Sequence, residues 1–423
     1  MDEDHVHTVS RKNRMTTILF CPVTFNLAET TRMIQVARAL DAGYDAVFMG
    51  YEHDFVHLIT DAGFRYIACE PAWTDAERDQ AMAYDQGKTL KSPFTEELVT
   101  ARVSRERELI RELGARAVVT GSNLTSFIAA RAEGVPLFFP VPFALTQPQV
   151  AQTPHLWMVQ GRSRLARAAD RVATSLFRWF YNTAPIAPKA FATVARANGV
   201  APLKTIGSLI TADYNLLTEM PWELDGFTLP STFHRVGPIF ANIDAPLPPI
   251  VEELAARDIP LVYLALGSSG NRDLALRCAR ALGTLPVNVI APIRQYVTDA
   301  DDLPANVHVT DLLPAPKLGG YVDAAVIHGG QGTVQTACAT GIPFVGMGLQ
   351  PEQTWHVRLC EQRGNAISLP PKAAGSAEFL DAVNRVLTDP GIRRAAAEVK
   401  DAYVGEDGAR ASARFIEDTI SQA

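Results

Sequence analysis

The amino-acid sequence predicts an α/β protein with two domains, each a doubly wound parallel sheet covered by helices. The chain has 423 residues, which is more than one hydrophobic core usually serves. Short apolar runs such as 16–23 and 261–266 are typical of strands buried on both faces of a parallel sheet. Segments with apolar residues at helical spacing, such as 29–40, follow these runs, and this alternation is typical of doubly wound sheets.

The elements of the first half follow one another in that pattern. Apolar runs predict strands at 46–49, 66–69, 117–120, 137–142 and 214–218, with helices at 29–40, 55–62 and 124–132. The stretch 71–102 is long, polar and irregular, and such loops at the carboxyl end of a parallel sheet commonly bind ligands. Prolines accumulate between 221 and 250, so we expect the interdomain linker there.

The stretch 322–351 carries the strongest chemical signal in the chain. An apolar run, 322–327, ends at His328-Gly329-Gly330-Gln331-Gly332, and a helix is expected from Thr333 to Gly341. Glycines let the backbone turn sharply and approach a ligand. A helix N-terminus presents unpaired N–H groups and a partial positive charge, so it suits a phosphate, to which His328 could add a donor. Taken alone, the pattern is equally compatible with a tight turn.

Motifs between 306 and 369 place this turn in a wider context. In chain order they are Asn306-Val307-His308-Val309 with Asp311-Leu312-Leu313-Pro314, HGGQGT at 328–333, Gly341-Ile342-Pro343, and Glu352-Gln353 followed by Gly364. In order and spacing this segment resembles the C-terminal signature of the family 1 nucleotide-sugar glycosyltransferases, the glucuronosyl- and macrolide-type enzymes. The resemblance implies the GT-B fold, in which two Rossmann-like domains face a cleft.

The resemblance also implies how the chain is divided. We expect a disordered tail at 1–14, an acceptor-binding domain at 15–225, a linker at 226–250, a donor-binding domain at 251–404, and a helix at 405–423 that crosses back to the first domain.

The second domain is expected to bind the nucleotide-sugar donor. The turn at 328–333 and a second turn, Gly267-Ser268-Ser269-Gly270 after the strand at 261–266, would face the diphosphate. The backbone of Leu313 would pair with the base, and Glu352-Gln353 would bind sugar hydroxyls. The acid that holds the ribose in the family is Thr336 here, and Gln335 is a candidate substitute. The donor-binding residues implied by the resemblance are Gly267, Ser268, Ser269, Leu313, His328, Gly329, Gly330, Gln331, Gly332, Thr333, Glu352 and Gln353.

The first domain departs from the family pattern at its catalytic position. The family has a Gly-His pair before the first helix, whose His is the general base, whereas this chain has Ala28-Glu29. A carboxylate in an apolar cleft can act as a base near neutral pH because burial raises its pKa, so Glu29 is the candidate catalytic residue. The alternative is a purely structural role, since an acid in the first turn suits the helix dipole.

The carboxylate that orients the family His is absent as well. After the predicted strand at 117–120 the chain has Gly121-Ser122-Asn123 in its place. Ser122, Asn123 and Phe143 are the candidate acceptor-binding residues. For Ser122 and Asn123, capping of the next helix is an equally good interpretation.

The segment 156–181 combines five arginines with interleaved aromatic and apolar residues and one acid, Asp170. A basic amphipathic helix of this kind can lie on an anionic membrane. It can also be a surface helix whose arginine stems cover the core. The second interpretation is favoured, so peripheral membrane contact is compatible with the sequence but not expected.

Composition and charge exclude several protein classes. A net charge of -7 argues against nucleic-acid binding, which calls for a concentrated basic face. The five cysteines are far apart and are expected to be buried thiols of a reducing compartment, not metal ligands or disulfides. No apolar run approaches the length of a membrane span, and no secretory pattern begins the chain, so a cytoplasmic location is expected.

The sequence therefore predicts an inverting, metal-independent hexosyltransferase of the antibiotic-biosynthesis type. Its co-substrate would be a UDP- or dTDP-sugar and its acceptor a small molecule, with no further cofactor, as a monomer or homodimer. Two alternatives remain open. A nucleotide-sugar epimerase of the same fold would turn over the donor without an acceptor, and a non-catalytic nucleotide-sugar-binding accessory protein would bind the donor without turnover.

Overall fold

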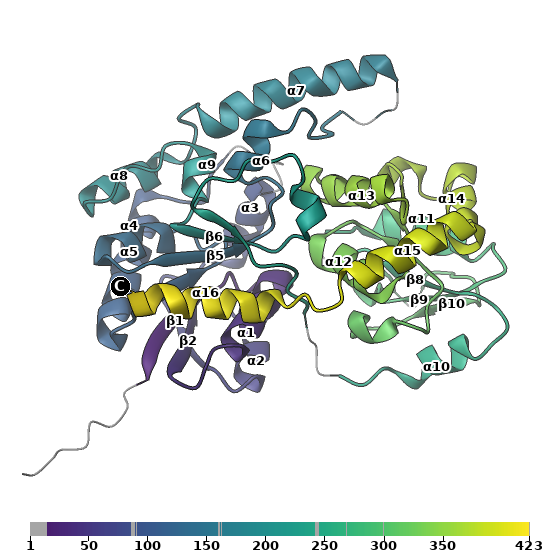
Figure 1. Ribbon diagram of the computed structural model, residues 1–423, viewed down its shortest axis with the longest axis horizontal. Helices are drawn as coiled ribbons and strands as arrows, with labels where there is room; N and C mark the ends of the chain where they lie inside the picture. The colour runs from purple at the N-terminus through teal and green to yellow at the C-terminus, as the bar shows by residue number, and fades with distance from the viewer. Residues whose placement is uncertain are drawn as a thin grey trace, which may run out of the picture.

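The computed structural model describes residues 15–422, except 86–88, 90, 160, 162, 242–244, 268 and 299. These residues form two α/β domains side by side, each a parallel sheet between layers of helices (Figure 1). The fold class predicted from the sequence is confirmed.

The first sheet has seven parallel strands in the order β3-β2-β1-β4-β5-β6-β7. The strands are β1 (Thr16–Cys21), β2 (Tyr44–Gly50), β3 (Arg65–Ala68), β4 (Ala117–Thr120), β5 (Leu137–Val141), β6 (Tyr214–Leu217) and β7 (Phe233–Arg235). The helices of this half are α1 (Leu27–Arg38), α2 (Val56–Asp61), α3 (Asp75–Asp85), α4 (Glu96–Leu113), α5 (Ser126–Glu133), α6 (Gln147–Gln152), α7 (Arg164–Asn182), α8 (Lys189–Ala197) and α9 (Ile206–Leu209).

The second sheet has six parallel strands in the order β10-β9-β8-β11-β12-β13. The strands are β8 (Leu261–Ala265), β9 (Asn288–Ala291), β10 (Val307–Val309), β11 (Ala324–Ile327), β12 (Phe344–Gly346) and β13 (Ala366–Ser368). The helices are α10 (Pro249–Ala255), α11 (Arg272–Leu282), α12 (Gln331–Thr340), α13 (Pro351–Arg363), α14 (Ala377–Thr388), α15 (Pro390–Ala402) and α16 (Gly408–Gln422).

Each sheet is buried because apolar side chains alternate between two cores. In β1, Leu19 enters the core on one face, while Ile18 and Phe20 enter the core on the other. The last helix, α16, covers that second face, where Ile416 packs in the same cluster (Figure 1). The chain thus returns from the second domain to the first, and the Glu417 carboxylate accepts a 2.7 Å hydrogen bond from the Asp41 N–H.

Two segments differ from the sequence-based expectations. Strand β7 adds to the first sheet, although it lies within the stretch 226–250 that was expected to be linker; it is short and carries little apolar pattern of its own. The stretch 71–102, expected to be irregular, contains α3 and the start of α4. Thr74 and Glu77 bond each other's backbone N–H groups, so a capping box begins α3.

None of the helices in the described parts of the chain combines the length and apolar character that crossing a bilayer requires.

Candidate active site

The candidate site lies where each sheet reverses its strand order. The reversal falls between β1 and β4 in the first sheet and between β8 and β11 in the second. Parallel sheets bind ligands outside the carboxyl ends of their strands at such a point. Glu29 follows β1 and Gly121 follows β4, while Gly267 follows β8 and His328 follows β11. The topology therefore brings the predicted catalytic and diphosphate-binding residues to these two edges.

Glu29 is buried in the first turn of α1, with 5% of its surface exposed. Asn26 caps this helix, because its side-chain oxygen accepts a 3.2 Å hydrogen bond from the Glu29 N–H. The Glu29 carboxylate itself accepts hydrogen bonds from the N–H of Val23 at 2.6 Å and of Ser122 at 3.0 Å. Gly121 leaves the space that this carboxylate fills, since a Cβ there would lie 1.7 Å from Oε1.

The environment of Glu29 suits proton transfer. Burial raises the pKa of its carboxyl group, while the N–H groups of Val23 and Ser122 and the charge of Arg32 act in the opposite direction. A carboxylate with a raised pKa can take up a proton near neutral pH. The two N–H donors also fix its orientation. Asn26, and not Glu29, caps the helix, while the Glu29 carboxylate is held by backbone N–H groups of two neighbouring loops.

The three predicted acceptor residues occupy different environments. Ser122 is exposed beside Glu29. Asn123 is buried, and its amide donates to Ser126 Oγ at 2.9 Å and to Glu106 Oε1 at 3.3 Å, so it serves a polar network beneath the site. Phe143 is fully buried and stacks edge-on against Trp355 of α13. Its ring therefore shapes the contact between the domains and presents no exposed surface to an acceptor.

The glycine turn after β11 encloses the His328 ring. A Cβ at Gly267 or at Gly330 would lie 2.5 Å from ring atoms of His328, so both positions need glycine. His328 is 7% exposed, and its Nδ1 lies 3.5 Å from the Ala265 carbonyl oxygen. Burial lowers the pKa of His328, with the Ala265 carbonyl and Glu352 opposing that shift.

Helix α12 begins directly after this turn, and no side chain caps it. Its N-cap is Gly330, followed by Gln331, Gly332 and Thr333 in the first turn. An uncapped N-terminus leaves N–H groups and the positive end of the helix dipole available to an anion. The uncapped start of α12 lies at the end of β11, where the sequence predicted a phosphate-binding site.

The remaining predicted donor residues lie around the same turn. Gln353 donates a 3.1 Å hydrogen bond to Ser269 Oγ, which joins the two loops. A Cβ at Gly329 would lie 2.8 Å from the Gln353 carbonyl oxygen, so the turn approaches α13 closely. Leu313 is buried in the core, which leaves only its backbone to pair with a base. Ser268 lies outside the described residues.

Gln331 and Gln335, which the sequence singled out for the donor site, join the two domains through residues that it did not single out, Arg32, Thr218 and Glu219. Gln331 Oε1 accepts hydrogen bonds from Thr218 at 3.0 Å and from Arg32 at 3.4 Å, and its Nε2 donates to Glu219 at 2.8 Å. Gln335 donates to the Thr218 carbonyl oxygen at 2.6 Å and is 2% exposed. The amide of Gln335 is thus engaged between the domains, and that of Gln331 faces the first domain.

A cluster of buried charged side chains lies beside these interdomain hydrogen bonds. The fully buried His356 ring lies between Glu223, with Nδ1 3.9 Å from Oε1, and Glu352, with Nε2 3.7 Å from Oε1. Burial opposes a charge on His356, but the two carboxylates outweigh it and raise its pKa to about 9. Burial raises the pKa of Glu219 to about 8, and repulsion from the Glu223 carboxylate adds to the shift. The sequence did not predict this cluster, because its two halves, Glu219 with Glu223 and Glu352 with His356, lie in distant segments.

In the part of the chain that the structure describes, no group of three or more His, Cys, Asp and Glu side chains is arranged to hold a metal ion.

Known proteins resemble the chain across both domains. A family model described as the C-terminal domain of erythromycin biosynthesis protein CIII-like proteins matches residues 278–410. A PGL/p-HBAD biosynthesis glycosyltransferase of Mycobacterium tuberculosis is 25% identical over 413 residues, which cover 93% of this chain and 90% of the relative.

Solved structures extend this similarity to the fold. The spinosyn forosaminyltransferase SpnP matches with a TM-score of 0.71 and 16% identity, covering 96% of this chain and 100% of that chain. The glycosyltransferase VinC in complex with dTDP matches with a TM-score of 0.69 and 19% identity, over 96% of this chain and 100% of that chain.

Proposed function

We propose that this chain, which belongs to the family 1 glycosyltransferases of the GT-B fold, transfers a sugar from a UDP- or dTDP-sugar to a small-molecule acceptor. The observation that carries the proposal is the position of the buried Glu29 carboxylate. It lies at the switch point of the first sheet, and Arg32, one turn further along α1, bonds Gln331 in the first turn of α12. This contact links the helix that carries the proposed base to the helix whose N-terminus is the proposed diphosphate site.

This arrangement suits an inverting displacement. The acceptor hydroxyl oxygen attacks C1 of the sugar on the side opposite the diphosphate, and its proton passes to Glu29. The bond between C1 and the diphosphate oxygen breaks, and the diphosphate leaves with the electron pair. A base with a raised pKa is matched to this proton transfer near neutral pH.

The second domain would stabilise the leaving diphosphate. His328 and the N–H groups of the first turn of α12 lie at the end of β11, where the dipole of the helix favours negative charge. Such fixed dipoles can neutralise the developing charge without a metal ion, so we propose a metal-independent reaction that needs no cofactor beyond the donor.

The names of the similar proteins support the substrate class. Erythromycin biosynthesis, spinosyn and PGL/p-HBAD biosynthesis are natural-product or glycolipid pathways, and the VinC structure holds dTDP. We therefore propose a natural-product or glycolipid acceptor, and dTDP-sugars are the donors to test first.

Thermal unfolding with UDP, dTDP, GDP and ADP tests the donor site. A ligand bound only by the folded state stabilises it by about 2.7 kcal/mol at a hundredfold excess over Kd. We expect stabilisation by dTDP or UDP that is lost in His328→Ala. His57→Ala is the matched control, because His57 is exposed on α2 in the first domain. No stabilisation by any nucleotide would overturn the donor assignment.

Turnover tests the role of Glu29. Glu29→Gln keeps the shape of the side chain but removes the base, so we expect it to bind nucleotide normally and to lose transfer by about a hundredfold or more. The engagement of both Glu29 oxygens by backbone N–H groups gives the accessory-protein alternative its support. Binding without turnover in the wild type would favour that alternative, and acceptor-independent epimer formation would favour an epimerase.

A further inference from the structure

Helix α7 exposes an apolar stripe to solvent on the outer edge of the molecule (Figure 1). At 100° per residue, Leu165, Val172, Leu176 and Trp179 fall within about 60° of one another around the helix. They are 83%, 70%, 56% and 53% exposed, and Phe180 beside them is 40% exposed. The helix is therefore a surface helix, as expected, and its apolar face points outward.

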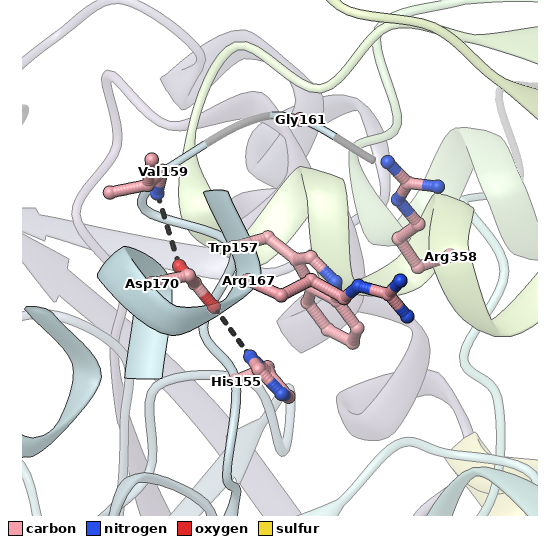
Figure 2. Close-up of a pocket in the computed structure, with 7 residues that line it drawn as sticks. All are labelled: His155, Trp157, Val159, Gly161, Arg167, Asp170 and Arg358. Atoms are coloured by element: carbon pink, nitrogen blue, oxygen red, sulfur yellow. Dashed lines mark hydrogen bonds and ion pairs between the residues drawn. The ribbon is translucent and has the colours of Figure 1, made fainter. Parts of the chain in front are cut away.

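The opposite face of α7 fixes the helix to the protein. Asp170 accepts hydrogen bonds from His155 Nδ1 at 2.9 Å and from the Val159 N–H at 3.0 Å (Figure 2). Thr174 Oγ1 accepts another from the Leu156 N–H at 3.0 Å. Asp170 and Thr174 are buried. The segment before α7 thus holds its polar face inward, and the apolar stripe faces away from the protein.

Arginines flank the stripe on one side. Arg164, Arg167 and Arg171 are exposed, and within the described residues none of them forms a hydrogen bond or an ion pair. A cavity of about 250 Å³ borders the helix, and Arg167 and Arg358 of α13 are among the residues that line it (Figure 2). Arg358 is paired with Glu361, so the three α7 arginines are what make this flank basic, although the whole chain has a net charge of -7.

We propose that α7 docks this protein on an anionic membrane surface, with the apolar stripe entering the headgroup boundary and the arginines binding lipid phosphates. Exposed leucine, valine and aromatic residues beside unpaired arginines are the combination that such a surface attracts. The inference goes beyond the transferase activity and does not depend on it. Docking would bring the site to acceptors that partition into a bilayer.

A second copy of the chain fits the same surface less well. In a two-fold dimer formed through α7, the same patch meets itself, so the unpaired arginines of both copies would come close together. Their repulsion would oppose association, whereas anionic headgroups neutralise them. The charge on the flank therefore favours a lipid surface over a self-interface.

The test is co-sedimentation of the full-length protein with vesicles. Phosphatidylcholine vesicles are compared with vesicles of phosphatidylcholine and phosphatidylglycerol in equal parts, at low and high salt. We expect binding to the anionic vesicles that weakens with salt. Arg164→Gln with Arg171→Gln should weaken it roughly 25-fold, at about fivefold per charge. Leu176→Ser with Trp179→Ser should weaken it at least about tenfold.

Matched controls separate docking from loss of structure. Ile259→Ser with Val404→Ser removes two exposed apolar residues elsewhere, and this variant should bind vesicles as the wild type does. Stabilisation by dTDP or UDP should be unchanged in the α7 variants, which keeps this test distinct from that of the transferase. Equal binding of neutral and anionic vesicles, or unchanged binding by the α7 variants, would overturn the proposal. So would a wild-type dimer that the Leu176 and Trp179 substitutions convert to monomer, because the surface would then belong to a second copy.

Discussion

Substituting Gly121 by alanine tests the arrangement of Glu29 without touching its charge. The added Cβ would lie 1.7 Å from Glu29 Oε1 and 2.1 Å from Cδ, so the carboxylate must leave its place. The hydrogen bonds from the Val23 and Ser122 N–H groups would be lost. Bonds to a charged group contribute at least about 1.5 kcal/mol each, so we expect Gly121→Ala to cost about 3 kcal/mol. In a domain of this size that lowers the Tm by about 6–12 °C.

A double-mutant cycle with Glu29→Ala isolates the contact. In the Glu29→Ala background the new methyl group enters vacated space, so Gly121→Ala should then cost less than about 1 kcal/mol. Urea unfolding measures both steps, and sugar transfer should fall in Gly121→Ala as far as in Glu29→Gln. Gly43→Ala is the control, because a Cβ at Gly43 meets nothing within 4 Å. Equal costs of Gly121→Ala in the two backgrounds would refute the packing argument.

The buried groups between the domains give two further predictions. The pKa of His356, raised from 6.5 to about 9, means that the folded state binds more protons than the unfolded state between these pH values. The free energy of unfolding should therefore fall as pH rises from 6.5 to 9, and the raised pKa of Glu219 acts in the same direction. The urea midpoint should change less across this range in His356→Asn than in the wild type. An identical dependence of the midpoint on pH in the two proteins would contradict this prediction. Gln331→Ala would leave Glu219 and Thr218 without their amide partner, so we expect a loss of about 2 kcal/mol in chemical unfolding. Thr336→Ala on the same helix is the control. The Thr336 hydroxyl donates to the Gly332 carbonyl oxygen within α12, so its loss should cost less than about 1 kcal/mol.

The sequence predicted most of the fold because the pattern of buried strands is local. The run at 16–23 and the turn at 328–332 each contain the residues that determine them, and both lie in the structure where they were expected. Helix α3 was missed because its residues are mostly polar, although the Thr74 and Glu77 capping pair was present in the sequence. Strand β7 was missed because three residues carry too little pattern.

The candidate site was predictable where its residues lie at the carboxyl end of a strand. His328 directly follows β11, and Glu29 lies in the first turn of the helix after β1, each at the switch point of its sheet. The contact between Arg32 and Gln331 joins residues 299 positions apart, so spacing carries no information about it. Phe143 also follows a strand, but it packs against Phe227 and against Trp355 of α13, which its local sequence does not reveal.

The two departures from the family pattern are physically one change. The family carries a histidine where this chain has Glu29, and commonly an acid at the turn that begins with Gly121. In this chain any side chain at position 121 would overlap the Glu29 carboxylate, because even a Cβ approaches it to 1.7 Å. A second carboxylate there would also repel the first. Glycine therefore makes room for Glu29, and backbone N–H groups orient its carboxylate in place of the family's acid. A histidine introduced at position 29 alone would find space at Gly121 but no carboxylate to hold its ring. We therefore expect the turnover of Glu29→His in the transfer assay to remain far below that of the wild type. Full activity of that single variant would contradict this account.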